Sequence, residues 1–243
     1  MTVEERSPAG SMIYRHKETD RPFTPARGDE EAIELITQHV ERHIGPVESV
    51  FHEIISDLIH LDILYVAPTK EKNYITLVTC GMSSLPMTVP NGAEAFRYAE
   101  LMICLPADWK MSEKSFEDEN NYWPIRCLKM LARLPHEYNT WFYTDHTIPN
   151  GDPAEPYSES TKLSGMMITI PSTVESLEEF FTLRASESKE VHFFSLTPLY
   201  NDEMNYKLKH GADALLAKLE KAEITQIIDP KRKNTCKRLF GLF

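Results

Sequence analysis

The sequence predicts a mixed α/β (α+β) fold, with one central, largely antiparallel or mixed sheet flanked by helices. Several runs are rich in β-branched and aromatic side chains, which is typical of strands. Other segments repeat apolar residues every three or four positions, which is typical of helices that pack on a core. Strand-like and helix-like segments do not alternate strictly along the chain. This mixture favours a single sheet covered by helices.

The overall charge limits the kinds of partner that the chain can bind. The 243 residues carry a formal net charge of −11, and 42% of them are hydrophobic. A general nucleic-acid binder has a basic footprint, and an anionic membrane also attracts basic proteins. We therefore expect no nucleic acid and no membrane as partner, whereas a basic protein partner fits the charge.

The remaining composition indicates a reduced, cytoplasmic protein without a cofactor. None of the four cysteines forms a CxxC pair, which argues against a zinc ribbon. The chain has neither GxGxxG nor GxxxxGK[ST], so the common nucleotide-phosphate sites are not expected. The N-terminus lacks the apolar core of a secretory signal, and no run of 18 apolar residues predicts a transmembrane helix.

Three segments are expected along the chain. Residues 1–28 contain prolines and mixed charges and are predicted to be a flexible arm. Residues 29–230 are predicted to form the α/β domain. Residues 231–243 are a basic tail that ends in apolar residues, and we interpret it as a solvated terminus. Two alternatives are that this tail contacts an acidic surface or packs against a second copy of a scaffold module.

The order of the elements follows from the residue patterns. A helix is predicted to begin after Asp29, which can cap it, and to end at Gly45-Pro46. Further helices are predicted at 122–134, ended by Pro135, at 174–183 and at 201–221. The predicted strands span residues 47–55, 58–68, 74–82, 99–106, 140–148, 163–171, 190–200 and 223–229. The loops 83–98 and 149–160 connect strands, and such loops often carry binding residues.

Four histidines near the start of the domain give one candidate site. His39 and His43 lie four positions apart on the first predicted helix, which can place two imidazoles on one face for a metal ion. His52 and His60 follow on the next two predicted strands and could complete a metal cluster. The simpler interpretation is a solvated helix face with outward-pointing strand histidines. A metal-dependent hydrolase that uses these four residues is therefore an alternative hypothesis.

The segment TDHTIPNGD gives a second candidate site. It contains Asp145, His146, Asn150 and Asp152, which we expect to form a polar surface that binds a partner. An Asp-His pair could also serve as general acid and base. However, adjacent strand residues point to opposite faces, and the sequence lacks a GxSxG nucleophile. No catalytic residues are therefore predicted. The aromatic residues Trp109, Trp123, Tyr138 and Trp141 around the second long helix are expected mainly in the core.

Five pieces of the chain, between about residues 45 and 235, resemble one protein family in their order and spacing. They are YITLVTCGMSSLPM, AELMICLPADW, YWPIRCLKMLA, TDHTIPNGD and FFSLTPLYNDEMNYKLKHGADALLAKL. Together they resemble the Suppressor of fused (SUFU) domain family, and the chain looks like a bacterial, single-domain member. The positions that carry the resemblance are Gly81, Met82, Ser83, Glu100, Leu101, Trp123, Pro124, Asp145 and His146.

The resemblance implies a mixed α/β fold without known catalysis. Animal members of the family bind and sequester a transcription factor, and bacterial relatives are associated with toxin systems. The resemblance therefore implies a non-enzymatic binding protein, most concretely an immunity protein or antitoxin that binds and occludes a toxin. An acidic chain fits a basic toxin, because complementary charges steer association.

Overall fold

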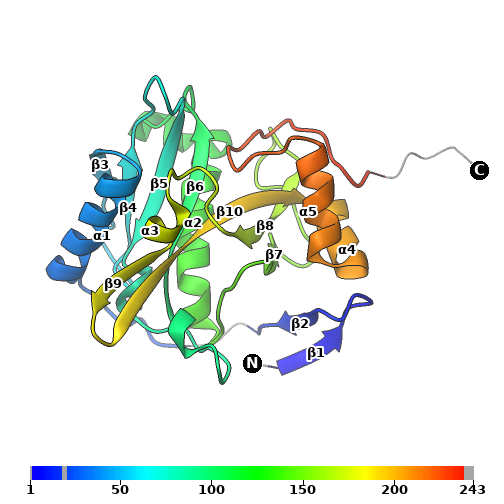
Figure 1. Ribbon diagram of the computed structural model, residues 1–243, viewed down its shortest axis with the longest axis horizontal. Coiled ribbons are helices and arrows are strands. Elements are labelled where there is room, and N and C mark those ends of the chain that lie inside the picture. The colour runs from blue at the N-terminus through cyan, green and yellow to red at the C-terminus, as the bar shows by residue number, and fades with distance from the viewer. Residues whose placement is uncertain (1, 18–20, 238–243) are drawn as a thin grey trace, which may run out of the picture.

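The fold is described by a computed structural model that covers residues 2–17 and 21–237, with residues 2–4 placed as backbone only (Figure 1). Arg238 and the apolar end of the tail lie outside the described residues. Within the described part, eight strands form one sheet in the order β3-β4-β5-β6-β10-β8-β7, with β9 paired to β10. Neighbouring strands are antiparallel except β6 and β10, which are parallel. The sheet is therefore mixed, which confirms the predicted fold class.

The strands of the sheet are short at its edges and long at its centre. In chain order they are β3 (Val47–Phe51), β4 (Asp62–Val66), β5 (Tyr74–Cys80), β6 (Tyr98–Pro106), β7 (Thr147–Pro149), β8 (Leu163–Thr169), β9 (Thr182–Ser186) and β10 (Lys189–Tyr200). The central strand β6 is buried on both faces. Leu101 and Ile103 face one hydrophobic cluster, whereas Met102 and Cys104 face another. This alternation explains why its sequence is continuously apolar.

Helices cover both faces of the sheet (Figure 1). The helices are α1 (Glu30–His43), α2 (Glu119–Glu137), α3 (Leu177–Phe180), α4 (Asn201–His210) and α5 (Ala212–Lys221), with 3-10 turns η1 (Met82–Ser84), η2 (Glu94–Phe96) and η3 (Glu113–Glu117). Helix α2 buries Trp123 and Leu131 in the cluster on one face. Helices α1 and α3 bury Val40 and Phe180 in the cluster on the other face. Helices α4 and α5 form a smaller cluster at the β8 end.

The first predicted helix is confirmed at its cap. The Asp29 carboxylate accepts a hydrogen bond from the Ala32 N–H (3.3 Å), and Glu30 and Glu31 lie in the first turn near the positive end of the helix dipole. Helix α2 extends beyond its prediction, because Pro135 lies inside its last turn and the helix ends at Glu137. Pro135 has no N–H and so removes one intrahelical hydrogen bond, and the helix continues for only two residues beyond it.

Several predicted elements differ from the structure. The predicted helix at 201–221 is two helices, because Gly211 at φ 92° and ψ 166° interrupts it. Of the predicted strand at 140–148, only Thr147 and Ile148 lie in β7, and the predicted strand at 223–229 is reduced to a bridge between Ile227 and Cys104. Strand β9 was not predicted. In the arm, β1 (Thr2–Arg6) and β2 (Met12–Arg15) form a hairpin outside the main sheet.

The start of the C-terminal tail is buried rather than solvated, which corrects the interpretation of residues 231–237. Arg232 pairs in a bidentate manner with Glu203 of α4, and Glu203 is 0% exposed. Thr235 also donates its N–H and its hydroxyl to Glu203, both at 2.9 Å. The tail therefore closes over the N-terminus of α4, whereas Lys231, Lys233 and Lys237 stay exposed.

Candidate recognition surface

The segments YITLVTCGMSSLPM and AELMICLPADW, which carry the family resemblance, meet at one buried carboxylate. Glu100 of β6 is 0% exposed and accepts hydrogen bonds from the Thr79 hydroxyl (2.6 Å) and from the N–H groups of Gly81 and Ser83 (3.0 Å each). The Ser83 hydroxyl adds another at 2.7 Å. Burial raises the pKa of Glu100, and these hydrogen bonds oppose that shift. Glu100 thus fixes the turn after β5, which is a structural role rather than a reactive one.

The polar segment 144–153 contains the edge strand β7, and Asp145, just before this strand, has an unusual backbone conformation. Asp145 has φ 69°, a region that favours Asn, Asp and Gly. Its N–H donates to the Ile168 carbonyl (2.8 Å), which ties the loop to β8. Burial raises the pKa of Asp145, the Lys207 charge lowers it, and the Asp213 charge raises it. The carboxylate is therefore held near charges from two helices.

Lys207 of α4 lies beneath this loop and was not predicted from the sequence. It is 6% exposed, and its Nζ donates to the Thr147 hydroxyl at 3.3 Å. Burial lowers the pKa of Lys207, and the nearby Asp145 charge opposes that shift. A single helix over residues 201–221 would have placed Leu208 on the same buried face as Leu215 and Leu219. Because the chain breaks at Gly211, α4 and α5 bury different faces. In α4 the buried residue is Lys207, and Leu208 is half-buried.

An aromatic row connects the two loops that were expected to carry binding residues. Phe96, at the end of loop 83–98, contacts Tyr143 with ring centroids 4.7 Å apart. Tyr143 stacks on Trp141 (5.7 Å), and Trp141 meets the ring of His146 edge-on (5.2 Å). All four side chains are half-buried. Burial and the Lys207 charge lower the pKa of His146 to about 4, so its imidazole is neutral at pH 7.

The other two predicted site residues lie farther along the same loop. The Asn150 amide donates to the carbonyls of Glu155 (2.8 Å) and Pro156 (3.3 Å), so it shapes the loop. The side chain of Asp152 is 83% exposed and lies 3.7 Å from the Arg15 guanidinium of the N-terminal hairpin. Asp145 and His146 therefore share one cluster with Lys207, whereas Asn150 and Asp152 form the outer part of the loop.

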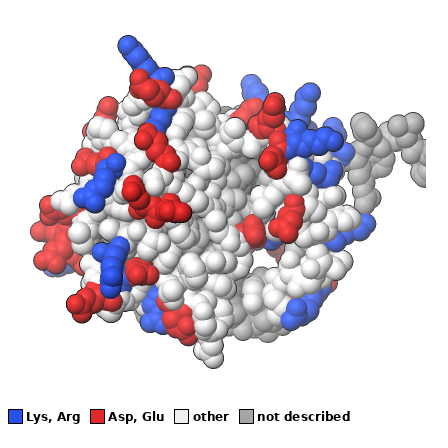
Figure 2. Space-filling view, viewed as in Figure 1, with Lys and Arg blue, Asp and Glu red and all other residues white. Residues whose placement is uncertain are grey.

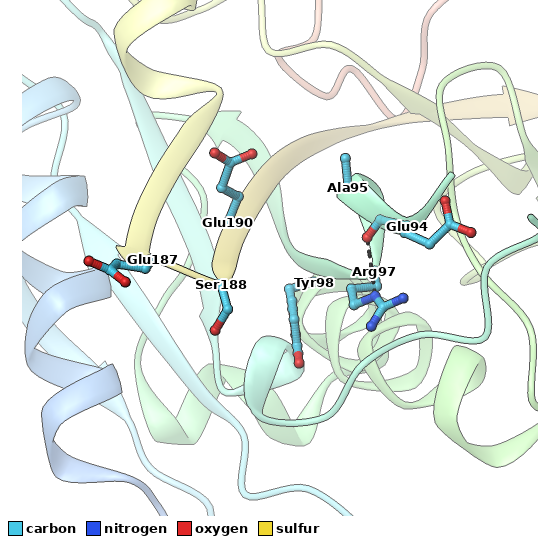
Figure 3. A pocket seen from close by; sticks show the side chains of 7 residues that line it. All are labelled: Glu94, Ala95, Arg97, Tyr98, Glu187, Ser188 and Glu190. Atoms are coloured by element: carbon cyan, nitrogen blue, oxygen red, sulfur yellow. Dashed lines mark hydrogen bonds between the residues drawn. The ribbon is translucent and has the colours of Figure 1, made fainter. Parts of the chain in front are cut away.

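A groove of about 350 Å³ opens between η2 and the β9–β10 turn (Figure 3). One wall is η2 and the start of β6, and the other is the turn between β9 and β10. The lining residues are Glu94, Ala95, Arg97, Tyr98, Glu187, Ser188 and Glu190. Three carboxylates and one guanidinium belong to the lining residues, so the lining carries a net negative charge. None of these residues was singled out from the sequence, because they come close together only when β9 pairs with β10.

The four histidines of the hydrolase alternative do not form one cluster. His39 is buried, bonds the Phe180 carbonyl (2.8 Å) and stacks on Phe193, beside His43. His52 and His60 instead approach the Asp62 carboxylate, at 3.2 and 3.4 Å. Among residues 2–17 and 21–237, no group of three or more His, Cys, Asp and Glu side chains is arranged to hold a metal ion. The four histidines of this alternative hypothesis thus lie as two separate pairs, one against Phe180 and Phe193 and one beside Asp62.

Comparison with known proteins identifies the family. The profile of the Suppressor of fused protein (SUFU) family matches residues 57–233, which is well over half of the chain. The chain belongs to the Suppressor of fused family. The match includes the Glu100 turn, the Trp123 helix, the loop with Asp145 and both groove walls. No curated protein matches the sequence.

Solved structures of SUFU proteins share the fold. A SUFU homolog from Neisseria gonorrhoeae superposes with a TM-score of 0.64 at 18% identity, covering 87% of this chain and 100% of that chain. The Sufu–Fu complex matches with a TM-score of 0.56 at 12% identity, covering 87% and 93%. Drosophila Suppressor of Fused matches with a TM-score of 0.50 at 12% identity, covering 78% of this chain and 46% of that one.

The family's sequence motifs have mainly structural positions in this chain. Trp123 is fully buried and stacks on Tyr157, which confirms its expected core role. Trp109 donates its indole N–H to the Asn121 carbonyl (2.9 Å). Among the described helices, none is both long and apolar enough to cross a membrane. Of the positions that carry the resemblance, Gly81, Asp145 and His146 are half-exposed, and the last two lie at one end of the aromatic row.

Proposed function

We propose that this SUFU-family chain is a non-enzymatic domain that binds and sequesters a protein partner. The observation that carries the proposal is the aromatic row from Phe96 to His146, which has charged groups at both ends. Half-buried aromatic side chains with a polar rim are typical of protein interfaces. One similar solved structure is itself a complex, the Sufu–Fu complex, which supports a binding role.

More specifically, we propose an immunity protein that binds a basic toxin and covers its active surface. The net charge of −11 supports a basic partner, because complementary charge speeds association. Two of the predicted acidic residues are partly balanced within the chain, Asp145 by Lys207 and Asp152 by Arg15. Glu94, Glu187 and Glu190, which line the groove, add exposed carboxylates to this part of the molecule. The rigid sheet holds loops 83–98 and 144–160 in place for steric occlusion.

The test is capture of the partner from the native cell lysate at low ionic strength, followed by native mass spectrometry. Wild type should hold one near-stoichiometric basic protein, and Asp145→Lys/Asp152→Lys should reduce its association rate. Glu113→Lys/Glu117→Lys adds the same charge on the exposed turn η3 and is the matched control. Asp152→Lys alone changes only an exposed residue, so it shows whether weaker binding of the double variant comes from misfolding or from the lost charge.

The outcomes separate the parts of the proposal. Capture that is equal for wild type and both loop variants would mean that the loop is not the contact surface. Absence of any protein partner would contradict the binding role. If the captured partner arrests cell growth when expressed alone and co-expression restores growth, the role is immunity. A partner that does not impair growth would contradict the immunity role and leave another kind of sequestration.

A further inference from the structure

We propose that His192 of β10 is a protonation switch that controls whether Phe96 keeps its place in the aromatic row. The neutral imidazole holds Phe96, whereas the protonated imidazole leaves its buried position and releases loop 83–98. The switch itself is a property of this chain alone. Its consequence for partner binding rests on the proposed function, because Phe96 is one end of the row that is proposed to contact the partner.

The imidazole of His192 closes a ring of aromatic side chains at the Phe96 end of the row. His192 is 5% exposed, and its centroid lies 4.7 Å from that of Phe96 and 5.2 Å from that of Phe181. Phe181 meets Phe194 (5.4 Å), and Phe194 meets Tyr143 (6.2 Å). Tyr143 in turn contacts Phe96, which completes the ring. Of these side chains, only an imidazole titrates near neutral pH, so His192 is the point at which a proton can disturb the packing.

One nitrogen of this imidazole has no hydrogen-bond partner. The Nδ1 atom of His192 is buried, and among the described residues no group bonds it. The other nitrogen, Nε2, hydrogen-bonds the Tyr98 backbone, which accounts for the single proton of a neutral ring. A second proton, on Nδ1, would create a buried cation whose new N–H has no acceptor. Because burying an unpaired charge is unfavourable, the protonated ring should move toward water.

The charges near His192 favour movement toward the surface. Burial lowers the pKa of His192, and the Glu190 carboxylate and the Tyr98 hydrogen bond oppose that shift. Glu190 lies on the same strand and is exposed, so it can pair with a protonated imidazole that has left the cluster. The other charged groups on the neighbouring elements are exposed or have contacts of their own: the glutamates of α3, Glu94, Arg97, Glu100, Arg184 and Lys189.

The pH range of the switch follows from the lowered pKa of His192. The buried arrangement is fully stable above the ordinary imidazole pKa of 6.5, and it loses stability as the pH falls from there toward the lowered value. At the other end of the row, burial and the Lys207 charge lower the pKa of His146 to about 4. His146 therefore stays neutral at mildly acidic pH, where a response of the row reports on His192.

The experiment is an NMR titration of the full chain from about pH 7.5 to about pH 5.5, which stays above the isoelectric point near 5.3. The ring C–H signals of His192 are followed together with the Tyr143 ring and the amides of residues 88–98 and 141–146. The loop signals should follow the same titration curve as His192, because its protonation displaces Phe96. Loop signals that stay constant, or that follow the curve of a different histidine, would overturn the proposal.

Matched variants identify the responsible histidine. His192→Gln keeps an N–H donor for the Tyr98 backbone but cannot titrate, so the acid response of the loops should disappear. His192→Phe keeps an aromatic ring at this position and gives a second non-titrating protein should the glutamine variant fold poorly. His136→Gln is the control, because His136 bonds the Met82 carbonyl (3.0 Å) and burial also lowers its pKa. A response that persists in both His192 variants, or that is lost in His136→Gln, would overturn the proposal.

The captured partner tests the consequence for binding. The apparent affinity should fall in proportion to the neutral fraction of His192, which is about twofold at the pH where half of its imidazoles are protonated. His192→Gln should bind equally across the same range. Constant affinity of the wild type, despite a response of the loops, would overturn the release step. Because the NMR titration needs no partner, its failure and a failure to capture any partner are separate results.

Discussion

At the scale of single residues, buried carboxylates with many donors determine how loops and termini are held. Glu100 organises the turn after β5, and Glu203 holds the C-terminal tail. The sequence did not indicate the second contact, because Arg232 follows Glu203 by 29 positions and lies in a run that looks solvated. Local patterns report local structure, whereas this ion pair exists only after the chain has folded.

The Glu203–Arg232 pair gives a stability prediction with a defined pH dependence. Burial alone would raise the pKa of Glu203, but pairing with Arg232 and hydrogen bonds from Thr235 and Tyr200 lower it below the ordinary 4.5. Arg232→Ala leaves a buried, unpaired carboxylate and should reduce the free energy of unfolding by about 3–5 kcal/mol at pH 7. Urea denaturation of both proteins measures this difference.

The sign of the pH effect follows from the lowered pKa of Glu203. A lowered pKa in the folded protein stabilises it above the unfolded value of 4.5, and that stabilisation is lost as the pH falls through the folded value. The difference between wild type and Arg232→Ala should therefore be largest near neutral pH and shrink below about pH 4.5. Lys233→Ala, at an exposed position in the same tail, should have little effect. A difference that grows on acidification would contradict this role of Glu203.

The candidate site also depends on contacts between distant residues, which local sequence patterns do not indicate. The sequence indicated Asp145 and His146, because a polar loop between strands often carries binding residues. It did not indicate Lys207, since a lysine in an amphipathic helix is ordinarily solvated and the break at Gly211 could not be placed from spacing alone. The groove acids were missed because β9 was not predicted, so Glu187 and Glu190 had no known neighbours.

At the scale of elements, strongly patterned segments were predicted well and mixed segments were not. Helix α1, with its Asp29 cap, and the apolar strands β5, β6, β8 and β10 follow from local sequence. The segment before β7 is rich in aromatic residues and looks like a strand, but its side chains instead form the row that links two loops. Aromatic content indicates a half-buried surface as well as a strand.

The turn that joins β5 to η1 gives a prediction about glycine. Gly81 has φ 125°, and a β-carbon there would lie 2.0 Å from the backbone oxygen of His60. Gly81→Ala should therefore lower the free energy of unfolding by about 3 kcal/mol or more, from backbone strain plus steric overlap. Gly92→Ala is the matched control, because its φ is 89° but nothing lies within 4 Å. Thermal and urea unfolding should show a much larger loss at Gly81, and equal losses would contradict the steric argument.

At the scale of the whole molecule, acidic side chains are distributed unevenly. Figure 2 shows many of them over the side that carries α1 and β9, interspersed with some lysines and arginines, while other lysines and arginines lie near the C-terminal segment beside acidic side chains. Exposed glutamates on α1 and α3 contribute to the acidic side: Glu30, Glu31, Glu34, Glu41, Glu178 and Glu179. The net charge of the chain did not reveal this arrangement. If the partner is basic, as proposed, its approach would be favoured toward this side of the molecule.

Loops 83–98 and 144–160, joined by the aromatic row, are proposed to form the surface that binds a protein partner. Hydrogen–deuterium exchange of the chain, alone and with its captured partner, measures which of these residues the partner covers. We expect partner-dependent protection at residues 88–98 and 141–152. Protection confined to the β3 edge or to the C-terminal segment, with these residues unchanged, would contradict it.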